Sequence, residues 1–125
     1  MGQATPATLA GKRILIAEDE PILAMLLEDL LTDLGCVVVG PALRLRDAEE
    51  MAREEELDGA LLDVNMGDGR TFEVARILAE RGIPFCFSTG YGAAGIEPAF
   101  CDALVLQKPY RQADLATALG SLPMA

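Results

Sequence analysis

Five short apolar runs recur along the chain, separated by longer segments in which apolar and polar residues mix. The runs are RILIA (13–17), CVVVG (36–40), GALLDV (59–64), IPFCFS (83–88) and ALVLQ (103–107). None of them alternates strictly between apolar and polar positions. Continuous apolar runs of this length are typical of parallel strands that are covered on both faces. We therefore expect five buried strands.

Helical patterns occupy the segments between these runs. The first begins with Pro21 and ends at Gly35, which suit the start and the end of a helix. Its apolar residues form a wide stripe, namely Ile22, Leu23, Leu26, Leu27, Leu30, Leu31 and Leu34. A second helix is predicted to open around Asp47, with capping-box spacing to Glu50. Further helices are expected at 71–81, closed by Gly82, near 96–101, which contains Pro98, and at roughly 112–119.

Strands and helices thus alternate five times, which predicts a doubly wound α/β fold with a five-stranded parallel sheet and helices on both faces. At 125 residues and 51% hydrophobic composition the chain suits one domain. We place that domain at 12–122, with a flexible lead-in at 1–11 and a tail at 123–125. We expect a stand-alone domain, and the alternative of a segment from a longer protein stays open.

Charge and composition exclude several functions. The net charge of −10 argues against nucleic acid and anionic membranes as partners, since both attract clustered basic residues. No stretch reaches the ~18 apolar residues of a membrane span, and we expect a cytoplasmic protein. The absence of histidine excludes a Ser-His-Asp triad and a histidine zinc site. Cys36, Cys86 and Cys101 are interpreted as small buried residues in a reducing cytosol.

Polar residues stand at the ends of four of the five predicted strands, where open parallel sheets bind ligands. They are Glu18 and Asp19, Asp63, Ser88 and Thr89, and Lys108 followed by Pro109. Three carboxylates at one edge repel each other by several kcal/mol in a medium of low dielectric. A divalent cation relieves that repulsion, and oxygen-only ligands favour Mg²⁺ or Mn²⁺ over zinc. A hydroxyl from Thr89 and the ammonium of Lys108 suit the oxygens of a phosphoryl group.

Each of these residues also has a simpler interpretation. The acids before Pro21 favour a helix N-terminus, Thr89-Gly90 is compatible with a plain turn, and Lys108 with a solvated surface lysine. Ser88 is the weaker hydroxyl candidate, a core or loop residue, and Asp68 is interpreted as a turn residue.

Together, Glu18-Asp19, Asp63, Thr89 and Lys108-Pro109 resemble the receiver domain of two-component response regulators, over about residues 13–119. The resemblance implies a flavodoxin-like sheet of strand order 2-1-3-4-5. It implies that Asp63 is the phosphoacceptor, attacking a phosphohistidine on a histidine kinase or phosphotransfer protein. Such a domain is a signalling module and not an enzyme, catalysing only its own phosphoryl transfer and dephosphorylation.

The resemblance also implies how magnesium is held. Asp19 and Asp63 would ligate Mg²⁺ directly, Glu18 would act mainly through water, and the backbone carbonyl of Asn65 would complete the set. Met66-Gly67 replaces the apolar-Pro pair common at this point of such domains, and we expect Gly67 to leave the loop more mobile.

The remaining roles concern switching. Lys108 would pair with Asp63 and later with the phosphoryl oxygens, Thr89 would move in to contact the phosphoryl group, and the bond before Pro109 would be cis. Val105 stands where many receivers carry a switching Tyr or Phe. FSTGYG (87–92) resembles a receiver variant with a Phe-Ala-Thr-Gly-Tyr-like motif. Tyr91 is therefore hypothesised to take over part of the signalling or to shield the phosphoryl group, the alternative being a loop tyrosine without a role.

Three functions follow. The first is a receiver that works as a phosphorelay shuttle, a phosphate sink or a phosphorylation-gated binder, through its last two helices and last strand. The second is a small Mg²⁺-dependent phosphatase, disfavoured because Asn65 stands where such enzymes need a second acid. The third is a degenerate receiver that binds proteins without phosphorylation, which the intact Asp63, Asp19, Thr89 and Lys108 argue against.

Overall fold

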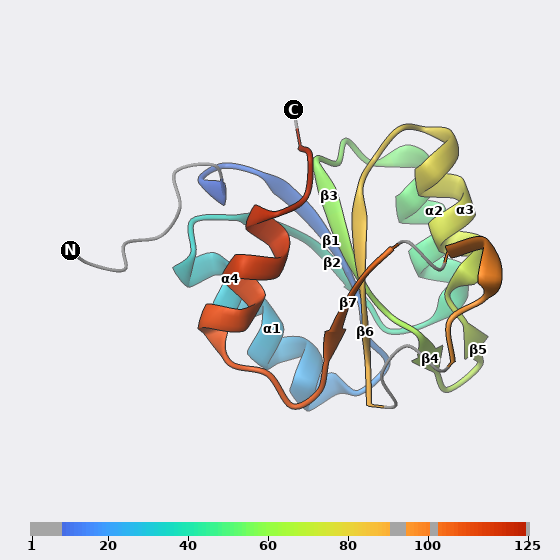
Figure 1. Cartoon of the computed structure of the whole chain (residues 1–125), viewed down its shortest axis with the longest axis horizontal. Helices are drawn as coiled ribbons and strands as arrows, with labels where there is room; N and C mark the ends of the chain where they lie inside the picture. The colour runs from blue at the N-terminus through green and yellow to red at the C-terminus, as the bar shows by residue number, and fades with distance from the viewer. Residues whose placement is uncertain (1–8, 91–94, 101–102, 125) are drawn as a thin grey trace.

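The computed structural model describes residues 9–90, 95–100 and 103–124. Its elements are β1 (Arg13–Ala17), α1 (Pro21–Asp33), β2 (Val37–Ala42), α2 (Leu45–Glu54), β3 (Gly59–Asp63), β4 (Asn65–Met66), β5 (Gly69–Arg70), α3 (Phe72–Glu80), β6 (Phe85–Thr89), the 3₁₀ helix η3 (Pro98–Phe100), β7 (Leu104–Gln107) and α4 (Gln112–Gly120). Five strands form a parallel sheet of order β2-β1-β3-β6-β7. Helices α1 and α4 cover one face, and α2 and α3 the other (Figure 1). Strands β4 and β5 form a separate pair, so β6 and β7 are the fourth and fifth strands of the main sheet. The predicted doubly wound sheet of order 2-1-3-4-5 is therefore confirmed.

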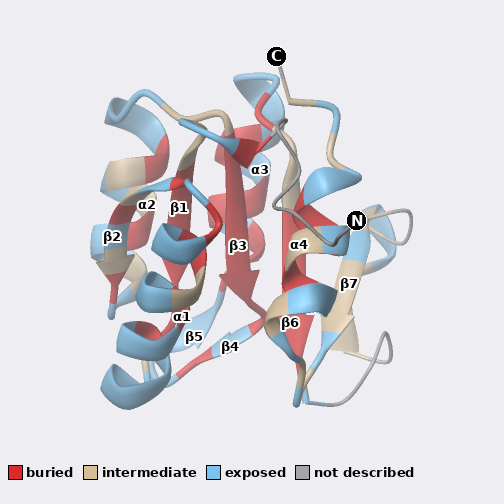
Figure 2. Cartoon of the chain, turned by 90° about the vertical axis from the view of Figure 1, so that its left-hand side faces the viewer, coloured by how far each residue is buried: buried red, intermediate tan, exposed pale blue. Residues whose placement is uncertain are grey.

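The core lies on both faces of the sheet, because successive side chains of a strand point to opposite faces. All five residues of the central strand β3 are buried. Leu62 and Phe87 pack beneath α2 and α3, whereas Ile16 and Leu61 pack beneath α1 and α4. Figure 2 shows the buried strands behind the largely exposed outer surface of α1. Within the described residues, no helix has the length and apolar character needed to cross a bilayer.

Helix α1 begins at Pro21 as predicted, but only part of its apolar stripe is buried. Leu27 and Leu31 face the core. In contrast, Ile22 is 77% exposed and Leu26 51% exposed, and the neighbouring Met25 is 66% exposed. The apolar residues span more of the helix circumference than the sheet covers. An apolar surface therefore remains on the outer side of α1.

Two predicted helices differ from the observed ones. Helix α2 begins at Leu45, two residues before Asp47, and the amide of Leu45 donates a 3.3 Å hydrogen bond to Oδ2 of Asp68. The predicted capping box between Asp47 and Glu50 is wrong, because the helix begins earlier and its first amide bonds to Asp68, in the loop after β3. Asp68, predicted to be a turn residue only, therefore also holds the start of α2. The predicted helix at 96–101 is also wrong: a 3₁₀ turn, Pro98–Phe100, stands there. Proline disfavours helical geometry at the residue before it, Glu97, and Cys101 lies outside the described residues.

Two stretches are more ordered than expected. Edge strand β2 continues past Gly40 to Ala42, through a cis Gly40–Pro41 bond and an irregular register, as edge strands tolerate. The loop after β3 forms a small antiparallel hairpin from β4 and β5.

The chain ends were predicted to be a flexible lead-in and a tail. Residues 1–8 lie outside the described part of the chain. Leu9, however, is fully buried in the core, and Met124 packs against the same cluster. Cys36 and Cys86 are buried free thiols, as their sequence context predicted.

Candidate functional site

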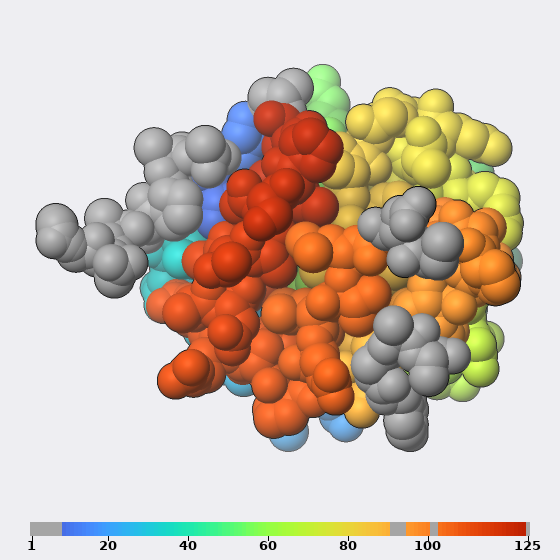
Figure 3. Space-filling view, in the orientation of Figure 1, coloured from blue at the N-terminus to red at the C-terminus, as the bar shows by residue number. Residues whose placement is uncertain are grey.

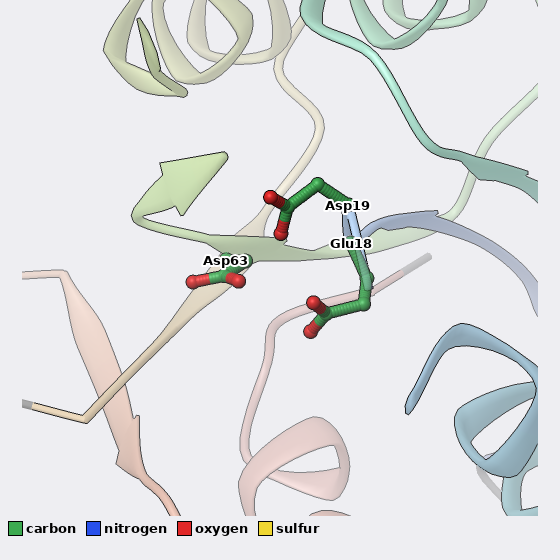
Figure 4. A group of neighbouring side chains, drawn as sticks. All are labelled: Glu18, Asp19 and Asp63. Carbon is green, nitrogen blue, oxygen red and sulfur yellow. The ribbon is translucent and has the colours of Figure 1, made fainter. Parts of the chain in front are cut away.

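Three carboxylates meet at the carboxyl edge of the sheet. Glu18 and Asp19 follow β1, and Asp63 ends β3, its neighbour in the sheet. One oxygen from each lies within 4.8 Å of the others, and the three side chains point into a common space (Figure 4). Glu18 is 1% exposed and Asp63 7% exposed. The fold therefore brings together the three acids that were predicted at strand ends, although they lie up to 45 residues apart in sequence.

Lys108 supplies the positive charge of the site. Its Nζ lies 3.1 Å from Oε1 of Glu18 and 3.1 Å from Oδ2 of Asp63. The residue directly follows β7, and its amide donates to the carbonyl of Thr89, which fixes it beside the end of β6. The bond from Lys108 to Pro109 is cis. Lys108 is thus a partner of two buried carboxylates and not a solvated surface lysine.

Burial and charge act against each other at Asp63. Burial and then the neighbouring charge of Glu18 raise the pKa of Asp63 to about 6, although the ammonium of Lys108 acts in the opposite direction. Burial on its own lowers the pKa of Lys108, but the two carboxylates outweigh it and raise that pKa. One lysine therefore compensates only part of the negative charge that the strands bring together.

Hydrogen bonds fix the phosphoacceptor candidate in place. The amide of Asn65 donates to Oδ1 of Asp63 at 3.3 Å. The hydroxyl of the fully buried Thr71 donates to the backbone carbonyl of Asp63 at 2.8 Å. The sequence analysis missed Thr71 because it starts a helix eight residues on, and only the return of the hairpin brings it back.

Asp19 is held by the hairpin. The amide of Gly67 donates a 2.6 Å hydrogen bond to its Oδ2. Gly67 lies in the turn between β4 and β5, whose strands pair Met66 with Gly69. This contact was also absent from the sequence analysis, because a backbone amide leaves no residue-type signal.

The hydroxyl groups at the end of β6 have different surroundings. Thr89, the predicted switch residue, is buried, and so is Ser88. Ser88 hydrogen-bonds with the side chain of Tyr110, the residue after the cis proline. Burial and then the charges of Glu18 and Asp63 raise the pKa of Tyr110, so this phenol faces the acidic cluster in its neutral form. Tyr110 was not singled out in the sequence, although its place after Lys108-Pro109 is a signal that could have found it.

The remaining predicted residues lie apart from this cluster or beyond the described chain. The side chain of Asn65 is exposed, which leaves its backbone carbonyl as the candidate ligand. Val105 is half-buried in β7 and packs against the core below α2 and α3. Tyr91 lies outside the described residues, so its role stays a prediction.

The donor set fits a hard divalent cation. Glu18, Asp19 and Asp63 offer only oxygen, and their ligand atoms are already gathered, as Mg²⁺ or Mn²⁺ would require. Neutralising part of the cluster's negative charge would also relieve the repulsion that raises the pKa of Asp63.

The chain belongs to the response regulator receiver domain family, whose sequence model matches residues 14–120. Receiver domains are signalling modules that bind Mg²⁺ at an acidic pocket and interact with histidine kinases or phosphotransfer proteins. The predicted resemblance is confirmed.

Three similar proteins illustrate this membership. The chain is 33% identical over 115 residues to the phyllosphere-induced regulator PhyR of Methylorubrum extorquens, covering 86% of this chain but 42% of PhyR. It is 30% identical to the chemotaxis protein CheY of Thermotoga maritima, covering 90% of this chain and 98% of CheY. The solution structure of SdrG from Sphingomonas melonis is 40% identical with a TM-score of 0.77, over 88% of this chain and 94% of SdrG.

Proposed function

We propose that this receiver accepts a phosphoryl group on Asp63, in a magnesium-dependent reaction, from the phosphohistidine of a histidine kinase or phosphotransfer protein. The observation that carries the proposal is the contact of 3.1 Å between Asp63 and Lys108 beside the clustered oxygens of Glu18 and Asp19. The carboxylates and the ammonium gathered at one sheet edge support a nucleophile beside a cation site. The protein works in the cytoplasm, where such kinases present their phosphohistidines.

The groups at that edge supply the nucleophile and the contacts to the phosphoryl group. An oxygen of Asp63 attacks phosphorus, and the new P–O bond forms as the P–N bond breaks and returns its electron pair to the donor imidazole. Lys108 stabilises the phosphoryl oxygens, and the hydroxyl of Thr89 contacts another. A bound Mg²⁺ would neutralise charge on these oxygens, held by Asp19, Asp63 and the Asn65 carbonyl, with Glu18 acting through water.

The surface beside the site suits a protein donor. A cavity of about 280 Å³ opens next to Glu18 and Lys108, and Leu23 and Leu26 of α1 line its apolar side. Exposed apolar patches of this kind mark protein interfaces. A kinase or phosphotransfer protein that buries the outer side of α1 would bring its phosphohistidine to the edge of the sheet where Asp63 lies.

The output of the domain is a phosphorylation-gated change in protein binding, or else relay or storage of the phosphoryl group. Phosphorylation adds charge and acceptor oxygens that bias a two-state surface. Thr89 and the variant positions Tyr91 and Val105 are the proposed switch. The target surface comprises β7 and α4, which run over the face seen in Figure 3. The helix expected before β7 is a 3₁₀ turn, so it adds little to this surface.

Two alternatives fit less well. A phosphatase would need an acid where Asn65 stands, and that side chain is exposed and neutral. A degenerate module would have no use for a lysine shared between two buried carboxylates, an arrangement that costs desolvation energy.

Intact-mass spectrometry after incubation with acetyl phosphate tests the proposal, with Mg²⁺ or with EDTA. Wild type should gain one phosphoryl group only with Mg²⁺, and Asp63→Asn none. Asp29→Asn, which changes an exposed acid on α1, is the matched control and should react like wild type. A further sample receives beryllofluoride, which mimics the bound phosphoryl group.

An adduct on Asp63→Asn, or one that forms equally in EDTA, would contradict the proposed chemistry. If neither the adduct nor a beryllofluoride complex forms on wild type, the degenerate module becomes the better description.

A further inference from the structure

We propose that the backbone amide of Gly67 positions Asp19 for cation binding, and that this contact depends on having glycine and not proline at position 67. The inference rests on the proposed function, since it concerns the same magnesium site. It assigns a role to the Gly67 amide, which donates to Asp19, a member of the acidic cluster.

The geometry is that of a charge-assisted hydrogen bond. The Gly67 amide nitrogen lies 2.6 Å from Oδ2 of Asp19, shorter than the roughly 2.9 Å typical of amide hydrogen bonds, and an ionised acceptor shortens such bonds. The neighbouring residue fixes the turn from outside, because Oδ2 of Asp68 accepts from the amide of Leu45 at the start of α2. Met66, on the other side, is buried. Gly67 therefore has an anchored residue on each side. These contacts hold the turn in place and do not support the greater mobility that was expected of this loop.

The contact leaves Asp19 suited to its task. A carboxylate has two oxygens, and a ligand that uses one of them can give the other to a hydrogen-bond donor. With Oδ2 bound by the amide, the carboxylate keeps one orientation toward the cluster that it forms with Glu18 and Asp63. Donors that orient metal ligands in this way typically raise metal affinity by about 10- to 100-fold.

Proline at this position would abolish the bond, because it has no amide hydrogen. The apolar-Pro pair common in similar domains therefore cannot make this contact. Space at Gly67 is also limited, since an added Cβ would lie 3.1 Å from Oδ2 of Asp19. Alanine keeps the amide and tests that crowding, whereas proline removes the amide as well.

The experiment compares Mg²⁺ affinity in the full chain for wild type, Gly67→Ala and Gly67→Pro, by calorimetric titration. We expect Gly67→Pro to bind Mg²⁺ about tenfold more weakly and Gly67→Ala within about threefold of wild type. The rate of phosphorylation by acetyl phosphate should be restored in Gly67→Pro by saturating Mg²⁺. Thermal unfolding in EDTA separates this from a loss of fold. Equal affinity in wild type and Gly67→Pro would overturn the inference.

A second measurement needs no change at Gly67. In ¹H–¹⁵N spectra of the Mg²⁺-free protein, Asp19→Ala should shift the Gly67 amide and speed its exchange with solvent, whereas Asp29→Ala should do neither. An amide that ignores Asp19→Ala would refute the contact itself. If wild type bound no Mg²⁺ at all, the proposed function itself would be contradicted. If wild type bound Mg²⁺ and was phosphorylated, and Gly67→Pro behaved in the same way, only this inference would be contradicted.

Discussion

Asp63 should cost the folded protein stability when no divalent cation is present. Its pKa rises from the ordinary 3.8 to about 6, chiefly through burial and the nearby charge of Glu18. A difference of that size corresponds to about 3 kcal/mol of unfolding free energy above pH 6. Asn has the same shape as Asp and cannot ionise, so Asp63→Asn should remove this cost.

The pH dependence has a definite sign. The folded state holds the Asp63 proton more tightly than the unfolded chain does. The destabilisation by Asp63 is therefore absent below about pH 4, where the carboxyl group is protonated in both states. It grows as the pH rises toward 6 and stays at its full size above that. In the variant, Lys108 keeps Glu18 but loses one of its two partners. We therefore expect a net gain of about 1–3 kcal/mol for Asp63→Asn at pH 7.

Urea unfolding followed by far-ultraviolet circular dichroism measures this gain, since the chain has no tryptophan. Wild type, Asp63→Asn and the exposed control Asp29→Asn are compared in EDTA from pH 4 to pH 8. Wild type and Asp63→Asn share every other acid, so the difference between their curves isolates Asp63, and Asp29→Asn shows the effect of removing an exposed acid. Millimolar Mg²⁺ should then stabilise wild type more than Asp63→Asn and reduce the difference between their free energies of unfolding.

Two results would refute the reasoning. Asp63→Asn could be less stable than wild type at pH 7 in EDTA, in which case Lys108 more than compensates the burial. Alternatively, a difference that is constant from pH 4 to pH 8 would mean that titration of Asp63 is not its source.

Three further substitutions test contacts around the site by urea unfolding. Thr71→Val removes the donor to the Asp63 carbonyl at nearly constant volume and should cost about 1–2 kcal/mol, whereas Thr71→Ser should cost less; equal losses would speak against the hydrogen bond. Tyr110→Phe and Ser88→Ala should each lose about 1 kcal/mol and couple by at least about 0.5 kcal/mol in a double-mutant cycle, so strict additivity would exclude their contact. Phe87→Leu should cost about 1–2 kcal/mol, because its ring contacts three other phenylalanines at centroid distances of 5.4–5.8 Å; a neutral result would show that they repack freely.

The strands were predictable because their signal is local. Burial on both faces demands continuous apolar residues, and β1 and β3 carry them with clear ends. Helix ends depend on partners elsewhere, and there the sequence misled: the amide that opens α2 bonds to Asp68, 23 residues away. The apolar stripe of α1 misled differently, since apolar residues such as Ile22 and Met25 face outward.

The site was predictable as far as side-chain chemistry at strand ends reveals it. That logic gathers Glu18, Asp63 and Lys108, which contact one another through their side chains. It cannot find Gly67, which acts through its amide, or Thr71, which acts on a backbone carbonyl. Such contacts arise from the path of the hairpin, which only the folded chain defines.

The charges of the built site explain why a divalent cation is the fitting partner. Glu18, Asp19 and Asp63 bring three negative charges when ionised, and Lys108 brings one positive charge, which leaves a net charge of −2. One divalent cation balances that charge, whereas a monovalent cation leaves half of it in a partly buried space. Transfer of a phosphoryl group then adds charge that Lys108 and the cation share. Because both needs are met at the same oxygens, the proposed requirement for Mg²⁺ follows from where β1, β3 and β7 end.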